Sequence, residues 1–311
     1  MNNNISIWSN FLSLKSILGI IISFICLYFV YSTFDSNGIM NQMIKLNFTY
    51  LFLAISCLFI SLLIRAFRWN LLFYDNNVKK YDLYRSEVLG FWGNSIFPLK
   101  MGELIKIHYA KKLTSKSYTF VFGTIILERL IDFILIIPFI FIFQIYFPSE
   151  LILGKISFFI FLIPLTILSY LIYKYIFPRL KENILSTVDK NLIKTTIDQR
   201  NLILLSTIAI WILIFLDVYF VQASLQLDLG FKDCFSIMIL GTIIYAVPSL
   251  PGGLATFHLA IQEFSINFLD MSDASSQAFA FTLHAHSYIF FIILGSYYFI
   301  KDSNQILTFK E

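Results

Sequence analysis

Runs of apolar residues long enough to cross a membrane recur along this chain. A helix needs about 20 predominantly apolar residues to span the hydrocarbon core of a bilayer. The sequence therefore predicts six membrane-spanning helices, at residues 16–34, 48–67, 118–147, 151–177, 201–225 and 275–300. Hydrophobic residues make up 58% of the 311 positions and charged residues only 14%, which leaves too little polar surface for a water-soluble globule. We expect an all-α polytopic membrane protein and exclude the soluble, secreted-scaffold and disordered classes.

Two further apolar stretches, 83–98 and 235–269, are interrupted by Pro and Gly before a crossing is complete. Non-helical backbone is tolerated at membrane depth only beside protein or a polar cavity. We therefore interpret both stretches as re-entrant or broken helical hairpins. The two hairpins share the pattern Pro-x-x-x-Gly, at 98–102 and at 248–252.

The matching interruptions favour an inverted repeat within a single transmembrane domain, residues 1–311. Paired interruptions in the two halves of a membrane chain are typical of such repeats, which bind their substrate where the halves meet. The halves would be 1–147 and 151–300. The alternative is that Pro and Gly are simply frequent in membrane helices.

Basic residues cluster in two connections. Ten Lys and Arg residues lie from Arg65 to Lys116, and six more lie from Lys174 to Arg200. Because cytoplasmic loops carry the excess of Lys and Arg, both connections are placed inside the cell. This pattern predicts a multi-pass protein of the inner (cytoplasmic) membrane with both termini in the cytoplasm. The first hairpin would then enter from the cytoplasm, and the second from outside.

Ionisable residues inside the third predicted span mark a candidate site. Glu128, Arg129 and Asp132 interrupt an apolar run, and the two carboxylates, four residues apart, share one helix face. Each charge costs about 2.5 to 3.5 kcal/mol at the centre of a membrane helix and is normally paired or lines a polar cavity. This face needs a cation, and the candidates are Arg65, Arg68, Lys100 and Lys106. The alternative is a charge cluster that only holds helices together.

The first hairpin offers a place for a phosphate group. Asn94 precedes the interruption at Pro98, whereas Lys100, Glu103 and Lys106 follow it. A broken helix exposes backbone N–H donors and the lysines add positive charge, a combination that holds anions at helix ends. The alternative is an interfacial amphipathic turn whose lysines extend toward water.

Histidines gather around the second hairpin. His258 follows the run at 251–253, and His284 and His286 lie in the last predicted span. Their spacing matches no metal-binding motif, so we predict neither a metal nor a cofactor and expect hydrogen bonding or proton-coupled chemistry. Asp217, inside the fifth span, is a candidate partner in a charge pair. The three cysteines fit no disulfide framework, and nucleic acid is not an expected partner.

Several short motifs follow one another along the chain. They are Arg65-Ala-Phe-Arg68, Gly93-Asn94, Gly102-Glu103, Glu128-Arg129-Leu-Ile-Asp132 and Pro251-Gly252-Gly253. In this order they resemble the lysylphosphatidylglycerol synthase transmembrane-region family, also called flippase-like, over nearly the whole chain. The resemblance implies a polytopic protein that moves or presents lipids across the cytoplasmic membrane, including aminoacylated phosphatidylglycerol and polyprenyl-phosphate-linked sugars.

The chain departs from the family pattern at two positions. The family usually has Gly-x-x-Glu after Pro-Gly-Gly, whereas this chain has Leu254 followed by Ala-Thr-Phe-His258. An Arg that is common in the last span is replaced by His286. An acid and a base are thus both exchanged for histidine, and the exchange is compensated if the two positions face each other.

We therefore expect a flippase-like protein that translocates an anionic phospholipid or a polyprenyl-phosphate-linked lipid, with the phosphate-bearing membrane lipid as its partner. The phosphate would be contacted by Arg65, Arg68, Lys100 and Lys106. A relay would be formed by Glu128, Arg129 and Asp132. Close approach of the backbone to the lipid would be allowed by Gly252 and Gly253. Asn94, Glu103, His258 and His286 complete the candidate substrate-binding set.

Two alternatives to translocation stay open at this point. One is a membrane glycosyl or phospholipid transferase with Glu103 or Asp132 as base. The other is a non-catalytic membrane subunit that works with a separate lipid-modifying synthase. The sequence contains no aminoacyl-transferase domain, so we expect a transporter rather than an enzyme.

Overall fold

The computed structural model describes residues 35–73, 78–97, 100–146, 190–246 and 250–302, together with Ile25, Cys26, Tyr28 and Ser32. Apart from those four single residues, the predicted spans at 16–34 and 151–177 lie outside the described residues, as do Pro98 and Pro248. Within the described ranges the regular elements are all helices. The all-α class is therefore confirmed.

Four long helices frame the molecule: α4 (Phe48–Leu71), α7 (Tyr118–Tyr146), α11 (Arg200–Ser224) and α14 (Asp273–Lys301). Each begins within a few residues of a predicted span. Helices α4, α11 and α14 are long and apolar enough to cross a membrane. The chain therefore has the helices of a membrane protein, and the count of six spans stays a prediction.

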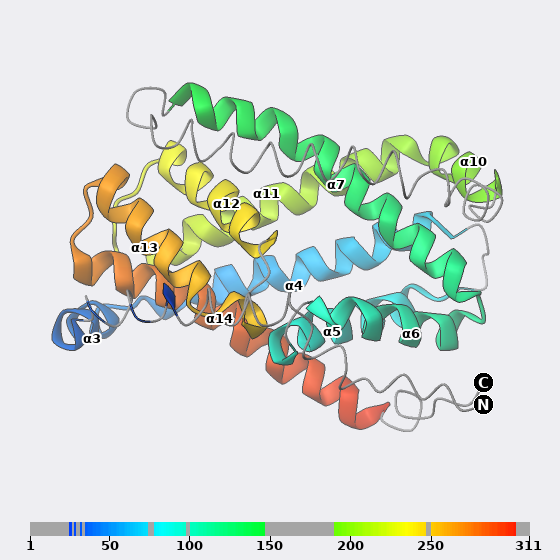
Figure 1. Ribbon diagram of the computed structural model, residues 1–311, viewed down its shortest axis with the longest axis horizontal. Helices are drawn as coiled ribbons and strands as arrows, with labels where there is room; N and C mark the ends of the chain where they lie inside the picture. The colour runs from blue at the N-terminus through cyan, green and yellow to red at the C-terminus, as the bar shows by residue number, and fades with distance from the viewer. Residues whose placement is uncertain are drawn as a thin grey trace.

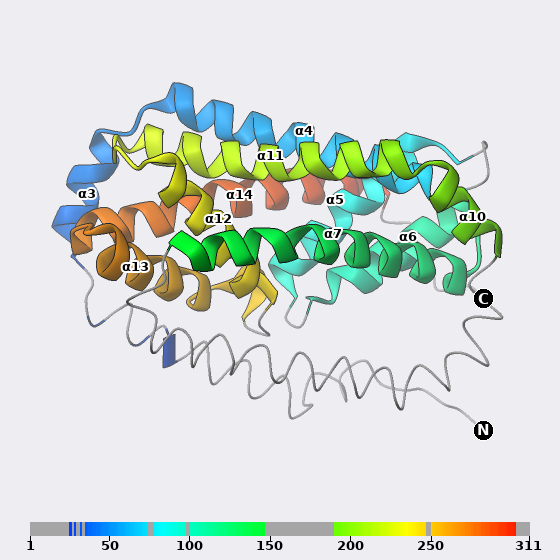
Figure 2. The same ribbon diagram turned by 90° about the horizontal axis from the view of Figure 1, so that it is seen from above.

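Two helical hairpins occupy the stretches that Pro and Gly interrupt. The first pairs α5 (Lys80–Ile96) with α6 (Gly102–Thr114). The second pairs α12 (Phe231–Ala246) with α13 (Thr256–Leu269) through the short 3₁₀ turn η3 (Pro251–Gly253). Figures 1 and 2 show the hairpins extending toward each other from opposite ends of the long axis, with their breaks near its middle. Turn η3 packs on α5 there.

The first hairpin is longer than the sequence predicted. The prediction places both of its limbs within 83–98, whereas in the structure α5 continues without interruption to Ile96 and α6 forms the return limb. The apolar-run criterion misses α6 because this helix of 13 residues carries Glu103, Lys106, Lys111 and Lys112. The re-entrant character of both hairpins stays a prediction.

Helices α4 and α11 lie side by side in an antiparallel pair along one edge of the bundle (Figure 2). The backbone N–H of Asn47, which precedes α4, donates to the carbonyl oxygen of Ser224, the last residue of α11, at 2.7 Å. Ala54 of α4 lies in one buried cluster with Val218 and Val221 of α11. The short helix α3 (Ser36–Ile44) packs on α14, and α10 (Lys190–Asp198) leads into α11.

Helix α14 is joined to the first hairpin by a tryptophan that lies on a glycine. A Cβ at Gly295 would come within 2.2 Å of the Cβ of Trp92 on α5. The Trp92 indole N–H donates to the Ser296 hydroxyl at 3.0 Å, and the rings of Phe91 and Phe291 stack with centroids 4.6 Å apart. These contacts hold α5 closely against α14.

The two limbs of the first hairpin also meet at a glycine. A Cβ at Gly102, the first residue of α6, would lie 1.9 Å from the carbonyl oxygen of Gly90 and 2.5 Å from the amide nitrogen of Asn94. Both neighbours are backbone atoms of α5, so α6 could accept a side chain here only by moving away.

We predict that Gly102→Ala lowers the melting temperature of the detergent-purified protein, because the added methyl separates α6 from α5. Overpacking of this kind costs about 1 to 3 kcal/mol. The matched control is Gly123→Ala, where an added Cβ would lie 3.7 Å from Leu192 Cδ2, an ordinary contact. Equal melting temperatures for the two variants would contradict the close packing of the hairpin.

Candidate functional site

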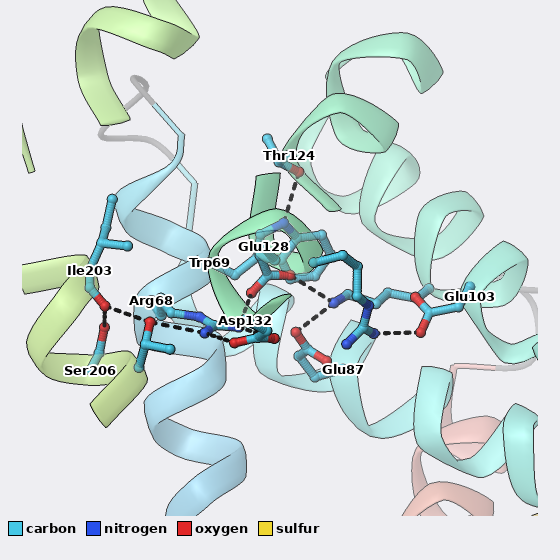
Figure 3. A network of polar contacts seen from close by, with 12 residues as sticks. Arg68, Trp69, Glu87, Glu103, Thr124, Glu128, Asp132, Ile203 and Ser206 are labelled. Carbon is cyan, nitrogen blue, oxygen red and sulfur yellow. Dashed lines mark hydrogen bonds and ion pairs between the residues drawn. The ribbon is translucent and has the colours of Figure 1, made fainter. Parts of the chain in front are cut away.

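A buried network of charged side chains lies where α4, the first hairpin and α7 meet. It contains Arg68 from α4, Glu87 from α5, Lys106 from α6, and Glu128 and Asp132 from α7. Figure 3 shows Arg68, Glu87, Glu128 and Asp132 turned toward one another, with the contacts continuing to α11 on one side and the separate contact of Glu103 lying on the other. The network thus connects segments that are up to 139 residues apart in the sequence.

Arg68 is held by both carboxylates of α7. Its guanidinium donates to the two oxygens of Asp132 at 2.5 and 3.2 Å and to Glu128 Oε1 at 3.4 Å. It also donates to the hydroxyl of Thr207 on α11 at 3.1 Å. With a relative exposure of 1%, Arg68 has no access to water, so these partners replace its hydration.

Lys106 occupies the other side of the network. Its ammonium donates to Glu87 Oε1 at 2.6 Å and to Glu128 Oε2 at 3.1 Å. The same ammonium lies 4.2 Å from the centroid of the Trp69 ring, a cation–π contact. The Trp69 indole N–H donates to Thr124 at 2.8 Å, which fixes the ring. Glu128 therefore bridges the two buried cations.

These pairings answer the sequence prediction that the α7 carboxylates need a cation. Arg68 and Lys106 supply it directly. Arg65 is half-buried, with its guanidinium 5.7 Å from the centroid of the Phe91 ring, and it acts electrostatically on Asp132 and Glu87. Three carboxylates face two fully buried cations, and both Arg65 and Arg129 interact electrostatically with these carboxylates.

A more open group of charges lies beside the network at the break of the first hairpin. Arg129 Nη2 donates to Glu103 Oε1 at 2.6 Å, and the Arg129 side chain is 52% exposed. Lys100 is exposed and lies in the left-handed region with φ of 56°. Its charge acts on both Arg129 and Glu103. The oxygens Asn94 Oδ1 and Glu103 Oε2 lack a hydrogen-bond donor within the described structure.

The break of the second hairpin also has left-handed backbone. Gly252 and Gly253 have φ of 67° and 78°, a region that glycine enters at little cost. The Gly252 carbonyl accepts a hydrogen bond from His284 Nε2 at 2.8 Å. A Cβ at Gly252 would lie 3.0 Å from the Tyr288 ring, so the backbone approaches α14 closely at this point.

His258 and His286 have different partners. The His258 ring packs against His284, with centroids 4.7 Å apart, whereas His286 Nε2 lies 2.8 Å from Asp217 Oδ1 on α11. The exchange of an acid and a base for two histidines would be compensated if His258 and His286 faced each other. In the structure each of them instead contacts a different partner. Asp217 therefore has His286 of α14 as its hydrogen-bonding partner, and the pair is ionic only when His286 is protonated.

Sequence reasoning missed two members of the network. Glu87 was counted with the charges of a cytoplasmic connection, although it is the one carboxylate within the apolar stretch 83–98, and that position was a usable signal. Thr207 gave no signal, because a single hydroxyl in an apolar helix usually bonds to its own backbone, as Thr207 also does with Ile203. The described residues contain no cluster suited to a metal ion.

One known family matches most of the chain. The family model of the lysylphosphatidylglycerol synthase TM region matches residues 16–295. The chain belongs to this family. A UPF0104 membrane protein of Methanocaldococcus jannaschii is 26% identical over 228 residues, which cover 69% of this chain and 95% of that protein. No solved structure gives a significant match to the chain. The matched range of this chain includes every charged residue of the network.

We predict that Lys106→Met destabilises the protein by about 3 to 5 kcal/mol, because it leaves Glu87 and Glu128 buried without their shared cation. Arg129→Ala removes a cation from a largely exposed ion pair and is expected to cost about 0 to 1 kcal/mol. The free energy of unfolding in mixed detergent–SDS micelles measures both effects. Similar values for the two variants would show that the buried network contributes little to stability.

Proposed function

We propose that this protein binds and translocates an anionic lipid, either a phospholipid or a polyprenyl-phosphate-linked lipid, across the cell inner (cytoplasmic) membrane. The observation that carries the proposal is the charged network beside the break of a hairpin that faces a second broken hairpin. Charged side chains inside a membrane protein are costly and are expected to mark a substrate or ion pathway. A purely structural contact could use apolar packing at similar or lower free energy.

The reachable cations at the first break are the proposed initial contacts for the phosphate. Arg129 and Lys100 are exposed, whereas Arg68 and Lys106 are almost completely buried against carboxylates. A phosphate bound by Arg129 would displace the Glu103 carboxylate, exchanging one anion for another without leaving the guanidinium unpaired. Arg65, Arg68, Lys106 and the carboxylates would then act as the relay, and Gly252 and Gly253 would let the second hairpin approach the headgroup.

The order of helices supports an arrangement in two related halves. Helices α4, α5, α6 and α7 have 24, 17, 13 and 29 residues, and α11, α12, α13 and α14 have 25, 16, 14 and 29. We propose that these are the cores of the halves 1–147 and 151–300, related as an inverted repeat with two re-entrant hairpins and six spans. Substrate sites of such proteins lie where the halves meet, and both termini would be cytoplasmic.

We predict that the detergent-purified protein retains one class of phosphate-bearing lipid, enriched over the membrane extract when both are analysed by mass spectrometry. Arg129→Ala and Lys100→Ala should reduce this enrichment without lowering the melting temperature, because both side chains are exposed. Lys45→Ala removes an exposed lysine before α4 and serves as the control. Retained lipid that mirrors the bulk membrane in all samples would argue against a lipid site and favour a subunit that binds a separate synthase.

We further predict that Glu128→Gln slows translocation of a fluorescent anionic lipid in proteoliposomes by about tenfold or more. A hydrogen bond to a charged group contributes about 1.5 to 3 kcal/mol, and about 1.4 kcal/mol corresponds to tenfold in rate. The variant should stay folded, because Arg68 keeps Asp132 and Lys106 keeps Glu87. Loss of folded protein, or unchanged translocation, would mean that the network only holds the helices together.

A further inference from the structure

A buried histidine–aspartate pair joins α11 and α14 in the second half of the chain. His286 and Asp217 have relative exposures of 6% and 7%, and their side chains meet at 2.8 Å. In the first half, Arg68 of α4 meets Asp132 of α7 in the corresponding way, and in both halves the first helix of the four is paired to the fourth. The two pairs differ in one property. Arginine stays charged under all conditions in proteins, whereas histidine gains and loses a proton near neutral pH.

The hydrogen-bond partners of His286 determine how many protons the pair holds. Its Nδ1 lies 2.9 Å from the carbonyl oxygen of Thr282, which can only accept, so Nδ1 carries hydrogen. Its Nε2 lies 2.8 Å from Asp217 Oδ1, and a hydrogen bond there needs one more proton. That proton belongs either to an imidazolium facing a carboxylate or to a carboxylic acid facing a neutral imidazole. Both forms contain the same number of protons and are neutral overall.

We propose that Asp217 and His286 form a proton-binding site, and that its loading and unloading are coupled to lipid translocation. The second part of this inference rests on the proposed function, and the first part does not. The step is a proton transfer to water and back. With the proton bound, the pair is neutral, and without it, a buried carboxylate faces a neutral imidazole. Since a charge in this position is costly, the unloaded state favours separation of α11 from α14 and entry of water.

Other titratable groups surround the pair without supplying a fixed charge. Cys57 of α4 and Tyr245 of α12 act electrostatically on Asp217, and a thiol and a phenol are neutral near neutral pH. His284 of α14 acts on His286 and is itself in contact with His258 of α13.

Two further helices pack against α14: α3 contains no ionisable residue, and the charges of α5 are engaged elsewhere. On α5, Glu87 pairs with Lys106, and Arg85 pairs with Asp302 after the end of α14 at 2.8 Å. Within the described contacts, the proton on the Asp217–His286 pair therefore sets the charge between α11 and α14 at this level.

Helix α14 connects this pair to both hairpins. Two residues before His286, His284 contacts the Gly252 carbonyl at the break of the second hairpin. One turn and a half beyond it, Phe291 stacks on Phe91 of the first hairpin. A change in the attraction between α11 and α14 therefore acts on the helix that contacts both proposed lipid-binding elements.

The proton-binding site can be tested without any substrate, by nitrogen-15 NMR of histidine-labelled protein in lipid nanodiscs. The signal that disappears in His286→Gln is assigned to His286. We expect its Nδ1 to carry hydrogen and its Nε2 to share a proton with Asp217 at neutral pH. In Asp217→Asn the ring should become a neutral imidazole protonated only at Nδ1. A His286 signal that titrates identically with and without Asp217 would overturn the site. His108→Gln, which removes a histidine on α6 that contacts Tyr118, is the control for assignment.

The coupling is tested in proteoliposomes that contain a fluorescent anionic phospholipid and carry an imposed pH gradient. With one proton per lipid, a gradient of one pH unit supports a lipid asymmetry of about tenfold, since one pH unit is a factor of ten in proton activity. The asymmetry should reverse when the gradient is reversed and should be lost in His286→Gln. His108→Gln should keep it.

The outcomes separate the two proposals. Wild-type protein that translocates lipid without responding to the gradient overturns the coupling and leaves the translocase intact. Wild-type protein that moves no lipid overturns the translocase and the coupling with it, and the NMR result then decides the proton-binding site alone. A gradient response that persists in His286→Gln overturns the assignment of the coupling to this pair.

Discussion

The Glu128 carboxylate is the shared contact that links α4, α6 and α7 in the first part of the structure. One of its oxygens faces Arg68 of α4 and the other faces Lys106 of α6, so a single side chain of α7 bridges two buried cations, each of which also has a second carboxylate partner. Lys106 in turn holds Glu87 of α5. The polar helix α6 can therefore lie inside a largely apolar molecule, because its buried ammonium is compensated from two directions. The same contacts place the break of the first hairpin near the middle of the bundle, where η3 packs on α5.

The two halves use similar helices for different electrostatic tasks. In the first half, the pairing between α4 and α7 is made by Arg68 and Asp132, and arginine stays charged in proteins. In the second half, the corresponding pairing between Asp217 and His286 depends on one proton. The breaks also differ, since Lys100 adds a cation to the first break, whereas the second break is held by the contact of His284 with the Gly252 carbonyl. A protein built in this way has one half with fixed charges and one half whose charge depends on its surroundings.

Much of this arrangement can be predicted from the sequence. The long helices are predictable because their apolar runs exceed the thickness of a bilayer, and the hairpin breaks because Pro and Gly interrupt such runs. The requirement for a cation near Glu128 and Asp132 follows from the cost of buried charge.

The identity of the partners does not follow from the sequence. Arg65, Arg68, Lys100 and Lys106 were equivalent candidates, and only the crossing of α4 and α6 over α7 selects Arg68 and Lys106. Likewise, the rotation of α14 decides that His286 faces Asp217 and that His284 faces η3. Such rotations are set by packing between distant segments, which local periodicity does not report.

The close packing of Trp92 on Gly295 restricts how α14 can move relative to α5. Every other residue near this point of α14 carries a Cβ, so an axial shift of α14 by one residue would push a side chain into the indole and break its bond to Ser296. The contact between Trp92 and Gly295 thus opposes an axial shift of α14 and leaves tilting of α14 about this contact as the motion of lowest cost. In a rearrangement that opens one face of the bundle and closes the other, we therefore expect α14 to tilt about its contact with Trp92. The stacked rings of Phe91 and Phe291 lie beside this contact.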